Sequence, residues 1–398
     1  MTVLSGCRRR LSILASSIAL IACGNSPAGV APPPAQGSDD AGGTTGPAEG
    51  DAGGTTPSGG RDSGTNPTPA SEDGGGTAAD AGGSEVSEAG SGADARSTAS
   101  ATRLVGYLPN YNGSYADWAK KLDFTKMTHL NIAFADVPAC AASPCTANDD
   151  MTFSTGDDQD LGAIVSAAHA AGVKVMISVG GGGSTNPLTG DQTIIQFFQA
   201  GLSTQLVASL ATFVSANDFD GIDIDIESPG SMGTPYGDFV SAVVSKFRPQ
   251  GKLITAAMAQ WIQSGIPSSA LTQFDFVNIM TYSNLSDSQT AMTYYSGLGV
   301  PKTQIVLGVK FFGDVEDAND DEPEYSDILS HYPNAWQSDQ VSGDSSYYGG
   351  DKIDYAGEAT MAKETQLGAQ YGGIMIWELT GDAPAPHSLL TIVQTNLP

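Results

Sequence analysis

The strongest chemical feature of the chain is a run of carboxylic acids at every second position, Asp223, Asp225 and Glu227, with isoleucines between them. Side chains of a strand alternate between its two faces, so the three acids are predicted to share one face, with neighbouring Cα atoms about 6.6–7 Å apart. Three carboxyl groups in a partly dry interior cannot all ionise, so at least one pKa is raised. A carboxylic acid that stays protonated near neutral pH is what general acid catalysis needs.

A solvated surface strand and a calcium site are the two alternative interpretations of this segment. The interleaved isoleucines argue against a surface strand. Three acids on one strand are too linear to surround a cation, and no glycine-bearing calcium loop follows them. The four histidines are scattered and show no zinc spacing. Gly180–Gly183 lacks the Lys-Ser/Thr of a phosphate loop, so close backbone packing is the better interpretation there. The sequence therefore predicts neither a metal nor a cofactor.

Eight apolar, β-branched segments alternate with helical patterns and are predicted to be strands. They are Leu104–Leu108, His129–Ala133, Lys174–Val179, Gly221–Ile226, Leu253–Ala257, Phe276–Met280, Gln304–Val309 and Gly373–Trp377. The predicted helices are Asp160–Ala171, Ile194–Ala216, Tyr236–Phe247, Ser286–Ser296 and Tyr355–Gln370. Eight such units in about 300 residues predict a (β/α)8 TIM barrel, whose chemistry lies at the C-terminal ends of its strands. A doubly wound sheet is the structural alternative, but it favours a glycine-rich turn after the first strand, where Pro109 stands instead.

The motifs of this barrel resemble those of glycoside hydrolase family 18, the chitinase-like barrels. Asp220–Glu227 matches the signature D-x-x-D-x-D-x-E in full, and Ser178–Gly181 matches S-x-G-G on the third strand. Smaller similarities are Val105-Gly106-Tyr107, Ala133-Phe134 and Trp377 on the eighth strand. The resemblance covers nearly all of 103–398.

The resemblance implies a role for each acid. Glu227 would protonate the glycosidic oxygen and later act as the base for water. Asp225 would orient the substrate's 2-acetamido group, whose carbonyl oxygen is the nucleophile, and Asp223 would share a proton with Asp225. Tyr282 resembles the tyrosine that hydrogen-bonds the acetamido carbonyl. Trp377 resembles the indole floor beneath the reacting sugar. Further substrate contacts are implied for Tyr107, Phe134, Ser178, Gly180, Gly181 and Met280.

The sequence departs from the family pattern after the sixth strand. The commonest members carry Asp after the tyrosine, in M-x-Y-D, whereas Tyr282 is followed here by Ser283 and Asn284. Asn284 is a candidate partial replacement for the missing acid. Trp261, just past the fifth strand, is the first candidate platform for a further sugar unit, ahead of Trp336 and the pair Tyr347-Tyr348.

These observations predict a monomeric hydrolase of β-1,4-linked N-acetylglucosamine polymers, most simply chitin, acting by a substrate-assisted, retaining mechanism. One alternative is an endo-β-N-acetylglucosaminidase acting on N-glycans, or a glucosaminidase acting on peptidoglycan. Another is a chitinase-like lectin without activity, but such proteins usually lose the terminal acid of the motif, and Glu227 is present.

The N-terminal part of the chain is predicted to direct export. Arg8-Arg9-Arg10 precedes a 12-residue apolar run that is too short to span a bilayer, so residues 1–23 are typical of a secretory signal. The run ends Leu20-Ile21-Ala22-Cys23-Gly24, which resembles a bacterial lipobox with Cys23 as the lipidated residue. Ordinary cleavage, with Cys23 incidental, is the alternative. We expect a lipid-anchored protein at the outer membrane or cell surface, or one released from it.

Residues 24–100 contain 19 Gly and 8 Pro and no Leu, Ile, Met, Phe, Tyr or Trp. This segment cannot bury enough apolar surface to fold and is predicted to be a disordered linker. The catalytic domain is therefore expected at 101–398. Cys140 and Cys145 lie five positions apart, a spacing that suits a small loop disulfide in an oxidising compartment.

The chain is strongly acidic, with a net charge of −27. Residues 101–398 hold 33 acidic and 12 basic residues, a formal charge of −21. Such a surface repels phosphate backbones, so no nucleic-acid partner is expected, and a neutral or cationic substrate is favoured.

Overall fold

The computed structural model describes residues 102–156, 158–183, 187–228, 233–259, 265–316 and 321–398. The predicted signal segment 1–23 with Cys23, the predicted linker 24–100 and the candidate platform Trp261 lie outside the described residues.

Eight parallel strands close into a barrel, with hydrogen bonds running around it in the order β1-β11-β7-β6-β5-β4-β3-β2. The barrel strands are β1 (Arg103–Pro109), β2 (His129–Ala135), β3 (Lys174–Gly180), β4 (Gly221–Asp225), β5 (Leu253–Ala259), β6 (Phe276–Met280), β7 (Ile305–Lys310) and β11 (Gly373–Trp377). The pairing of β1 with β11 closes the ring. The prediction of a TIM barrel is confirmed. The main difference at the site is that β4 ends at Asp225, so Glu227 follows the strand instead of continuing it.

Both faces of β4 are buried, as expected for a strand in a parallel barrel. Ile222 and Ile224 are fully buried, and each contributes about 1.5–3 kcal/mol to stability through the apolar surface removed from water. Asp223 and Asp225 are 0% and 3% exposed. The apolar face thus offsets the cost of placing two carboxyl groups in the barrel interior.

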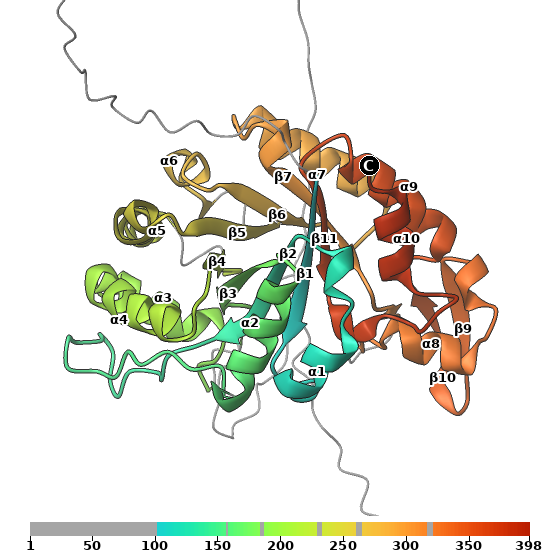
Figure 1. Ribbon diagram of the computed structural model, residues 1–398, viewed down its shortest axis with the longest axis horizontal. Coiled ribbons are helices and arrows are strands. Elements are labelled where there is room, and N and C mark those ends of the chain that lie inside the picture. The colour runs from blue at the N-terminus through green and yellow to red at the C-terminus, as the bar shows by residue number, and fades with distance from the viewer. Residues whose placement is uncertain (1–101, 157, 184–186, 229–232, 260–264, 317–320) are drawn as a thin grey trace, which may run out of the picture. The chain divides into compact units, whose positions relative to one another are not determined.

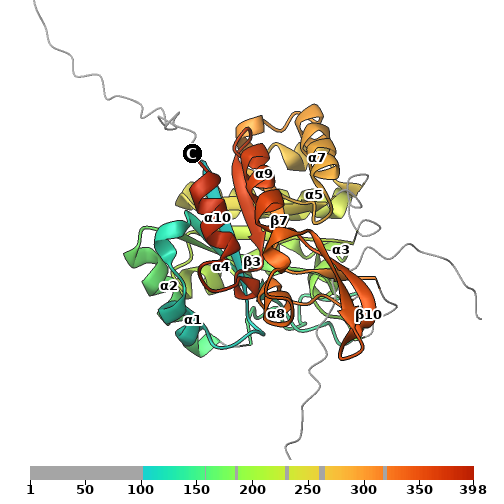
Figure 2. The same ribbon diagram turned by 90° about the vertical axis from the view of Figure 1, so that its right-hand side faces the viewer.

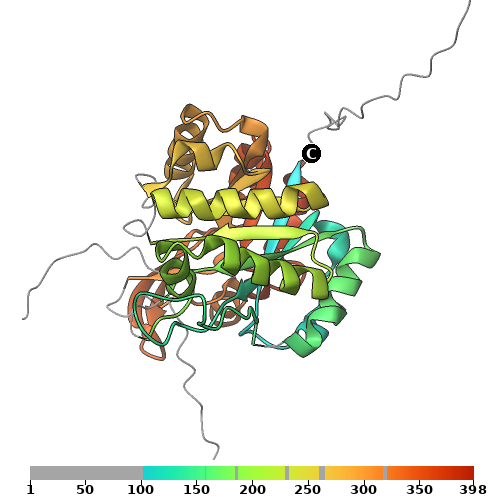
Figure 3. The same cartoon turned by 90° about the vertical axis from the view of Figure 1, so that its left-hand side faces the viewer.

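Helices surround the strands on all sides visible in Figure 1. They are α1 (Tyr115–Lys121), α2 (Leu161–Ala170), α3 (Asp191–Gln199), α4 (Ser203–Ala216), α5 (Thr234–Phe247), α6 (Ser268–Leu271), α7 (Leu285–Gly297), α8 (Tyr325–His331), α9 (Glu358–Gly368) and α10 (Leu389–Asn396). Short 3-10 turns lie at Phe124–Lys126, Asp158–Asp160, Arg248–Gln250, Lys302–Gln304, Ala335–Gln337 and Leu379–Gly381. Figure 3 shows α4 and α5, green and yellow, packed side by side on one flank of the barrel.

The predicted single helix Ile194–Ala216 is wrong. The structure divides this segment into α3 and α4, which are separated by Gly201 at φ +75°. A residue in the left-handed region ends an α-helix, and glycine takes that conformation without a steric penalty. The observed α3 also begins earlier than the predicted helix, at Asp191.

A three-stranded antiparallel sheet lies between β7 and β11 in the sequence and was not predicted. Its strands are β8 (Asp314–Val315), β9 (Gln340–Asp344) and β10 (Tyr347–Asp354), in the order β8-β10-β9. Figure 2 shows β10 beside α8. Tyr347 stacks on His331 of α8, with ring centroids 3.8 Å apart, and donates a hydrogen bond to Asp327 at 3.0 Å. The Tyr347 ring therefore joins the sheet to α8.

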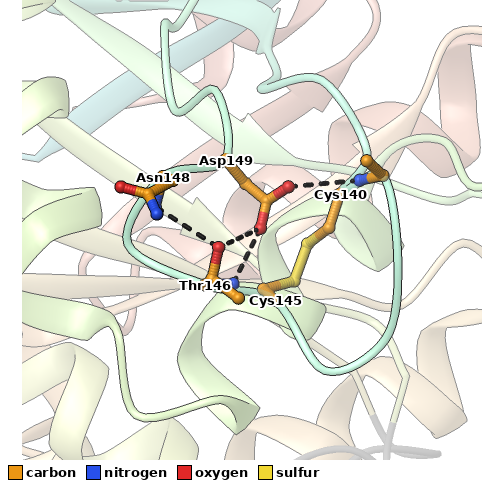
Figure 4. The surroundings of a disulfide bond; sticks show 6 residues. Cys140, Cys145, Thr146, Asn148 and Asp149 are labelled. Carbon is orange, nitrogen blue, oxygen red and sulfur yellow. Dashed lines mark hydrogen bonds between the residues drawn. A yellow bond between two sulfur atoms is a disulfide. The ribbon is translucent and has the colours of Figure 1, made fainter.

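The loop after β2 carries a disulfide between Cys140 and Cys145, whose Cα atoms are 5.5 Å apart (Figure 4). Asp149 organises the loop, since its carboxylate accepts hydrogen bonds from the backbone N–H groups of Thr146 at 2.7 Å and Ala141 at 3.3 Å. An antiparallel bridge between Asp136 and Ser154 joins the two ends of this loop. This loop is thus anchored next to the C-terminal end of β2.

Candidate active site

Asp223 is the most extensively hydrogen-bonded acid of the barrel interior. Its carboxylate accepts hydrogen bonds from the side chains of four other strands: Tyr107 at 2.6 Å, Ser178 at 2.7 Å, Thr255 at 2.6 Å and Asn278 at 3.3 Å. Burial raises the pKa of Asp223, and the four donated bonds oppose that increase. Because these donors surround the carboxylate, Asp223 is fixed in one orientation directly below Asp225.

Asp225 has a different environment one step closer to the strand end. Burial raises its pKa well above the usual value, and the charges of Glu227 and Asp223 raise it further. Its Oδ1 atom is buried and has no hydrogen-bond partner among the described residues. A buried carboxyl oxygen without a partner is costly unless a ligand donates to it. Asp225 is therefore suited to hold an N–H or O–H group of a bound molecule.

Glu227 completes the column of acids just beyond the end of β4. Its backbone N–H donates to Asp191 Oδ2 at 2.9 Å. Burial raises the pKa of Glu227 to about 8, the charges of Asp191 and Glu322 act in the same direction, and a hydrogen bond from the backbone of Gly182 opposes them. Its Oε1 atom is buried without a partner among the described residues. At neutral pH this side chain is protonated and can deliver a proton.

Tyr282 follows β6 and lies close to the same acids. Its hydroxyl contacts Met375 Sδ at 3.8 Å, and its ring meets Phe312 edge to face with centroids 5.8 Å apart. Burial raises the pKa of Tyr282 well above 10, and the charges of Asp225 and Glu227 raise it further. The phenol thus remains a hydrogen-bond donor beside the carboxyl groups.

Three aromatic side chains form an apolar floor next to the acids. Trp377, at the end of β11, stacks on Phe134 with centroids 5.6 Å apart and meets Tyr107 edge to face at 5.7 Å. Trp377 is 7% exposed. The Tyr107 hydroxyl is bound to Asp223, so this ring connects the floor to the acids. An indole held in this way offers an apolar surface against which the C–H face of a flat ligand can pack.

Gly180 and Gly181 allow β3 to approach β4 closely. They adopt φ values of +106° and +83°. A Cβ atom on Gly180 would lie 2.1 Å from the carbonyl oxygen of Asp225, and one on Gly181 would lie 2.6 Å from the Phe134 ring. The N–H of Gly181 donates to the same Asp225 carbonyl at 2.8 Å. These glycines position the acids through backbone packing.

Met280 and Asn284 lie on either side of Tyr282 in the sequence. Met280 is buried at the end of β6, opposite Ala259 of β5. Asn284 is exposed and is the N-cap of α7, where its side-chain oxygen accepts hydrogen bonds from the backbone of Ser286 at 3.0 Å and Asp287 at 3.1 Å. The structure thus gives Asn284 a contact set within α7 instead of one with the acids.

This geometry predicts that Asn284→Ala lowers the free energy of unfolding by about 1 kcal/mol, because the helix loses its cap, and leaves kcat unchanged. Chemical denaturation and turnover measured on the same preparations check this. Asn284→Ser, which keeps a capping side chain, is the matched control. A large loss of kcat in the alanine variant with unchanged stability would show that Asn284 acts in the active site and not only as a helix cap.

Four residues that act on the acids were not predicted from the sequence: Asp191, Thr255, Asn278 and Glu322. Thr255 and Asn278 are polar residues inside otherwise apolar strands, and Thr255 is in register with Asp223. That pattern could have identified them. Asp191 is the first residue of α3, and Glu322 lies in the loop between β8 and α8; the sequence carries no comparable pattern at either position. Among the described residues, no group of three or more His, Cys, Asp or Glu is arranged to hold a metal ion.

Comparison with known proteins gives one consistent result. Residues 103–382 match the profile of Glycosyl hydrolases family 18. The solved structure of the chitinase ChiB from the chitin utilization locus of Flavobacterium johnsoniae is 25% identical, covers 74% of this chain and 94% of that chain, and has a TM-score of 0.61. For a chitinase from Bacteroides thetaiotaomicron the values are 21%, 74%, 96% and 0.63.

The similarity to curated proteins is partial in length. The Secreted chitinase LysM12 of Penicillium expansum is 22% identical over 254 residues, which are 53% of this chain and 16% of that protein. Chitotriosidase-1 of Mus musculus is 23% identical over 261 residues, 54% of each chain. The matched part of the chain therefore spans about half of the length of Chitotriosidase-1 and about a sixth of the length of LysM12.

Proposed function

Because the chain belongs to glycosyl hydrolases family 18, we propose that it is an active hydrolase of β-1,4-linked N-acetylglucosamine polymers, most simply chitin. The observation that carries this proposal is the pair Asp225 and Glu227. Each has a buried carboxyl oxygen without a partner among the described residues, and Glu227 has a pKa of about 8. One group is suited to hold a substrate N–H and the other to supply a proton.

In the proposed first step, the carbonyl oxygen of the substrate's own 2-acetamido group attacks the anomeric carbon. Glu227 gives its proton to the glycosidic oxygen, the C–O bond breaks, and the leaving sugar departs as an alcohol. Asp225 accepts the acetamido N–H, which favours the attacking orientation and stabilises the positive charge of the resulting oxazolinium ion. Asp223, directly below, shares a proton with Asp225, which lets Asp225 carry the negative charge in this step.

In the second step, Glu227, now a carboxylate, removes a proton from water. The water oxygen attacks the anomeric carbon and reopens the oxazolinium ring, which restores the acetamido group and the protonated acid. Tyr282 donates to the acetamido oxygen, and Trp377 packs beneath the sugar ring. Two inversions at one carbon retain the β configuration.

A product analysis tests the proposal and its alternatives. The full chain is incubated separately with N-acetylglucosamine oligomers, an N-glycoprotein and peptidoglycan, and the products are identified by mass, with Glu227→Gln as the blank. Release of shorter N-acetylglucosamine oligomers supports the proposal. Products released only from the N-glycoprotein, or only from peptidoglycan, would identify that material as the substrate instead of chitin. Binding of oligomers without any product would make the protein a lectin.

For the rest of the chain we propose an exported, monomeric protein. Residues 1–23 would direct export, Cys23 would carry the lipid, 24–100 would be a linker, and 101–398 would be the catalytic domain. The acidic charge of that domain supports a neutral or cationic polymer as the partner and argues against nucleic acid. No helix in the described part of the chain has both the length and the apolar character needed to cross a bilayer.

The lipid anchor leads to a prediction. Cys23→Ser should move the protein from the membrane fraction to the soluble fraction, because the acylated residue is lost. One acyl chain holds a protein only marginally, so firm attachment of the unmodified protein implies several chains. Fractionation of the native host followed by mass analysis of the mature N-terminus is the measurement. A wholly soluble wild-type protein cleaved at another position would contradict the anchor.

A further inference from the structure

Asp191 is a buried carboxyl group that the catalytic scheme above does not use. It is the first residue of α3, follows the loop after β3, and is 1% exposed. Its own backbone N–H donates to the carbonyl of Gly181 at 2.9 Å. Gly181 is in turn bonded to the carbonyl of Asp225. Asp191 is therefore tied through one glycine to the strand that carries the acids.

The side chain of Asp191 binds the backbone of the proton donor itself. Its Oδ2 atom accepts the N–H of Glu227 at 2.9 Å, and its Oδ1 atom accepts Gln192 Nε2 at 3.0 Å. Gln192 Nε2 also donates to Ser228 Oγ, one residue beyond Glu227. Glu227 lies past the end of β4, where ladder hydrogen bonds no longer fix the backbone. These contacts replace the ladder at that point.

Burial raises the pKa of Asp191, and the hydrogen bonds donated to both of its carboxyl oxygens oppose that increase and favour the ionised, acceptor-only form. Its negative charge acts on three nearby acids: Glu227, Asp225 and Asp136. Asp136, from the loop after β2, is held by Thr193 of α3 at 3.1 Å. The groups that face Glu227 from other elements are Asp225, Glu322, Tyr282 and the N–H of Gly182.

We propose that Asp191 is a positioning residue for the general acid: it fixes the backbone at Glu227 and holds a negative charge beside the Glu227 carboxyl group. The charge favours the protonated form of Glu227, the form that donates. The hydrogen bond from the Glu227 N–H to Asp191 fixes the backbone there and so keeps the protonated side chain in one orientation. Two demands of acid catalysis, protonation and direction, are thus met by one side chain. The inference rests on the proposed function for its kinetic consequences but not for its structural ones.

Two substitutions separate the two effects. Asp191→Asn keeps an oxygen that can accept the N–H of Glu227 but removes the charge. The titration midpoint of Glu227 should fall by about one pH unit, because a like charge at close range is lost. Asp191→Ala removes the acceptor as well. It should lower kcat about tenfold even at pH 5, where Glu227 is protonated, because the acid is no longer held in position.

The measurement is NMR of the full chain with 13C at the glutamate side-chain carboxyls, with the Glu227 signal assigned by its loss in Glu227→Gln. Titrations of the wild type, Asp191→Asn and the control Asp238→Asn are compared, together with kcat/KM against pH on an N-acetylglucosamine oligomer. Asp238 is an exposed carboxylate on α5. Its variant should leave both the midpoint and the rate profile unchanged.

A lower Glu227 midpoint in Asp191→Asn alone, with the alkaline limb of kcat/KM moved in the same direction, supports the proposal. An unchanged midpoint together with a lower melting temperature would overturn it and leave Asp191 a structural residue. The NMR titration needs no turnover. A shifted midpoint in a protein that cleaves no substrate would therefore sustain this inference while the proposed function fails.

Discussion

Replacement of Glu227 with glutamine is expected to lower kcat at least about 10²-fold while oligosaccharide binding is largely kept. The amide has the size and shape of the acid but can neither give a proton to the glycosidic oxygen nor remove one from water, so both chemical steps are affected while binding is not. Steady-state kinetics on N-acetylglucosamine oligomers give kcat, and calorimetric titration of the same oligomers gives the affinity. Near-normal turnover in the variant would refute the assignment of Glu227 as the acid.

The same assignment fixes the direction of the pH dependence. Glu227 must be protonated to act, and its pKa is raised to about 8 by burial and by the neighbouring carboxylates. The alkaline limb of the wild-type kcat/KM profile should therefore fall as the pH rises through about 8. An acid with the ordinary glutamate pKa would already be inactive at neutral pH. The raised pKa is thus what allows a carboxylic acid to serve there.

Asp225→Asn is expected to have an effect of similar size, a loss of about 10²–10³-fold in kcat. The variant keeps a hydrogen-bonding group of the same size but removes the negative charge that stabilises the oxazolinium ion. It should also reduce the affinity for an inhibitor that mimics this cyclic intermediate more than the affinity for substrate, since the inhibitor carries the charge that Asp225 meets. Equal losses of affinity for the two ligands would argue against this role.

Asp220 provides a matched control within the same motif. It precedes β4 at the opposite end of the strand and accepts hydrogen bonds from His169 at 2.7 Å, Lys174 at 2.7 Å and the N–H of Val175 at 2.9 Å. Asp220→Asn should lower stability through these contacts and leave kcat of the folded protein near the wild-type value. A catalytic defect as large as that of Asp225→Asn would show that the assay reports on folding and not on chemistry.

The barrel could be predicted because its strands carry their pattern locally. Buried parallel strands are apolar on both faces, and the alternation of Ile222 and Ile224 with Asp223 and Asp225 fixes which face points inward. The antiparallel sheet of β8, β9 and β10 escaped prediction because β9 and β10 are polar and mostly exposed, so they lack that pattern. The break between α3 and α4 depends on one glycine conformation at Gly201, which a helical period does not reveal.

The candidate site could be predicted only in part, for the same physical reason. The acids lie on one strand, so their spacing is visible in the sequence. The donors to Asp223 come from residues 116 positions away at Tyr107 and 32 positions away at Thr255, and only closure of the barrel brings them together. Asp191, the first residue of α3, reaches the backbone N–H of Glu227 across 36 positions. Contacts of this kind depend on the path of the chain in space, which no local pattern contains.

The central claim is that the substrate's own acetamido oxygen is the nucleophile. The most direct test is NMR observation of the first product formed from an N-acetylglucosamine oligomer, alongside the same oligomer with the 2-amino group of the reacting sugar deacetylated. The account predicts a β-anomeric first product from the acetylated oligomer and no cleavage at the deacetylated sugar. An α-anomeric first product, or equal cleavage of the deacetylated oligomer, would show that a water molecule or a protein carboxylate makes the attack, and would contradict the role given to Asp225.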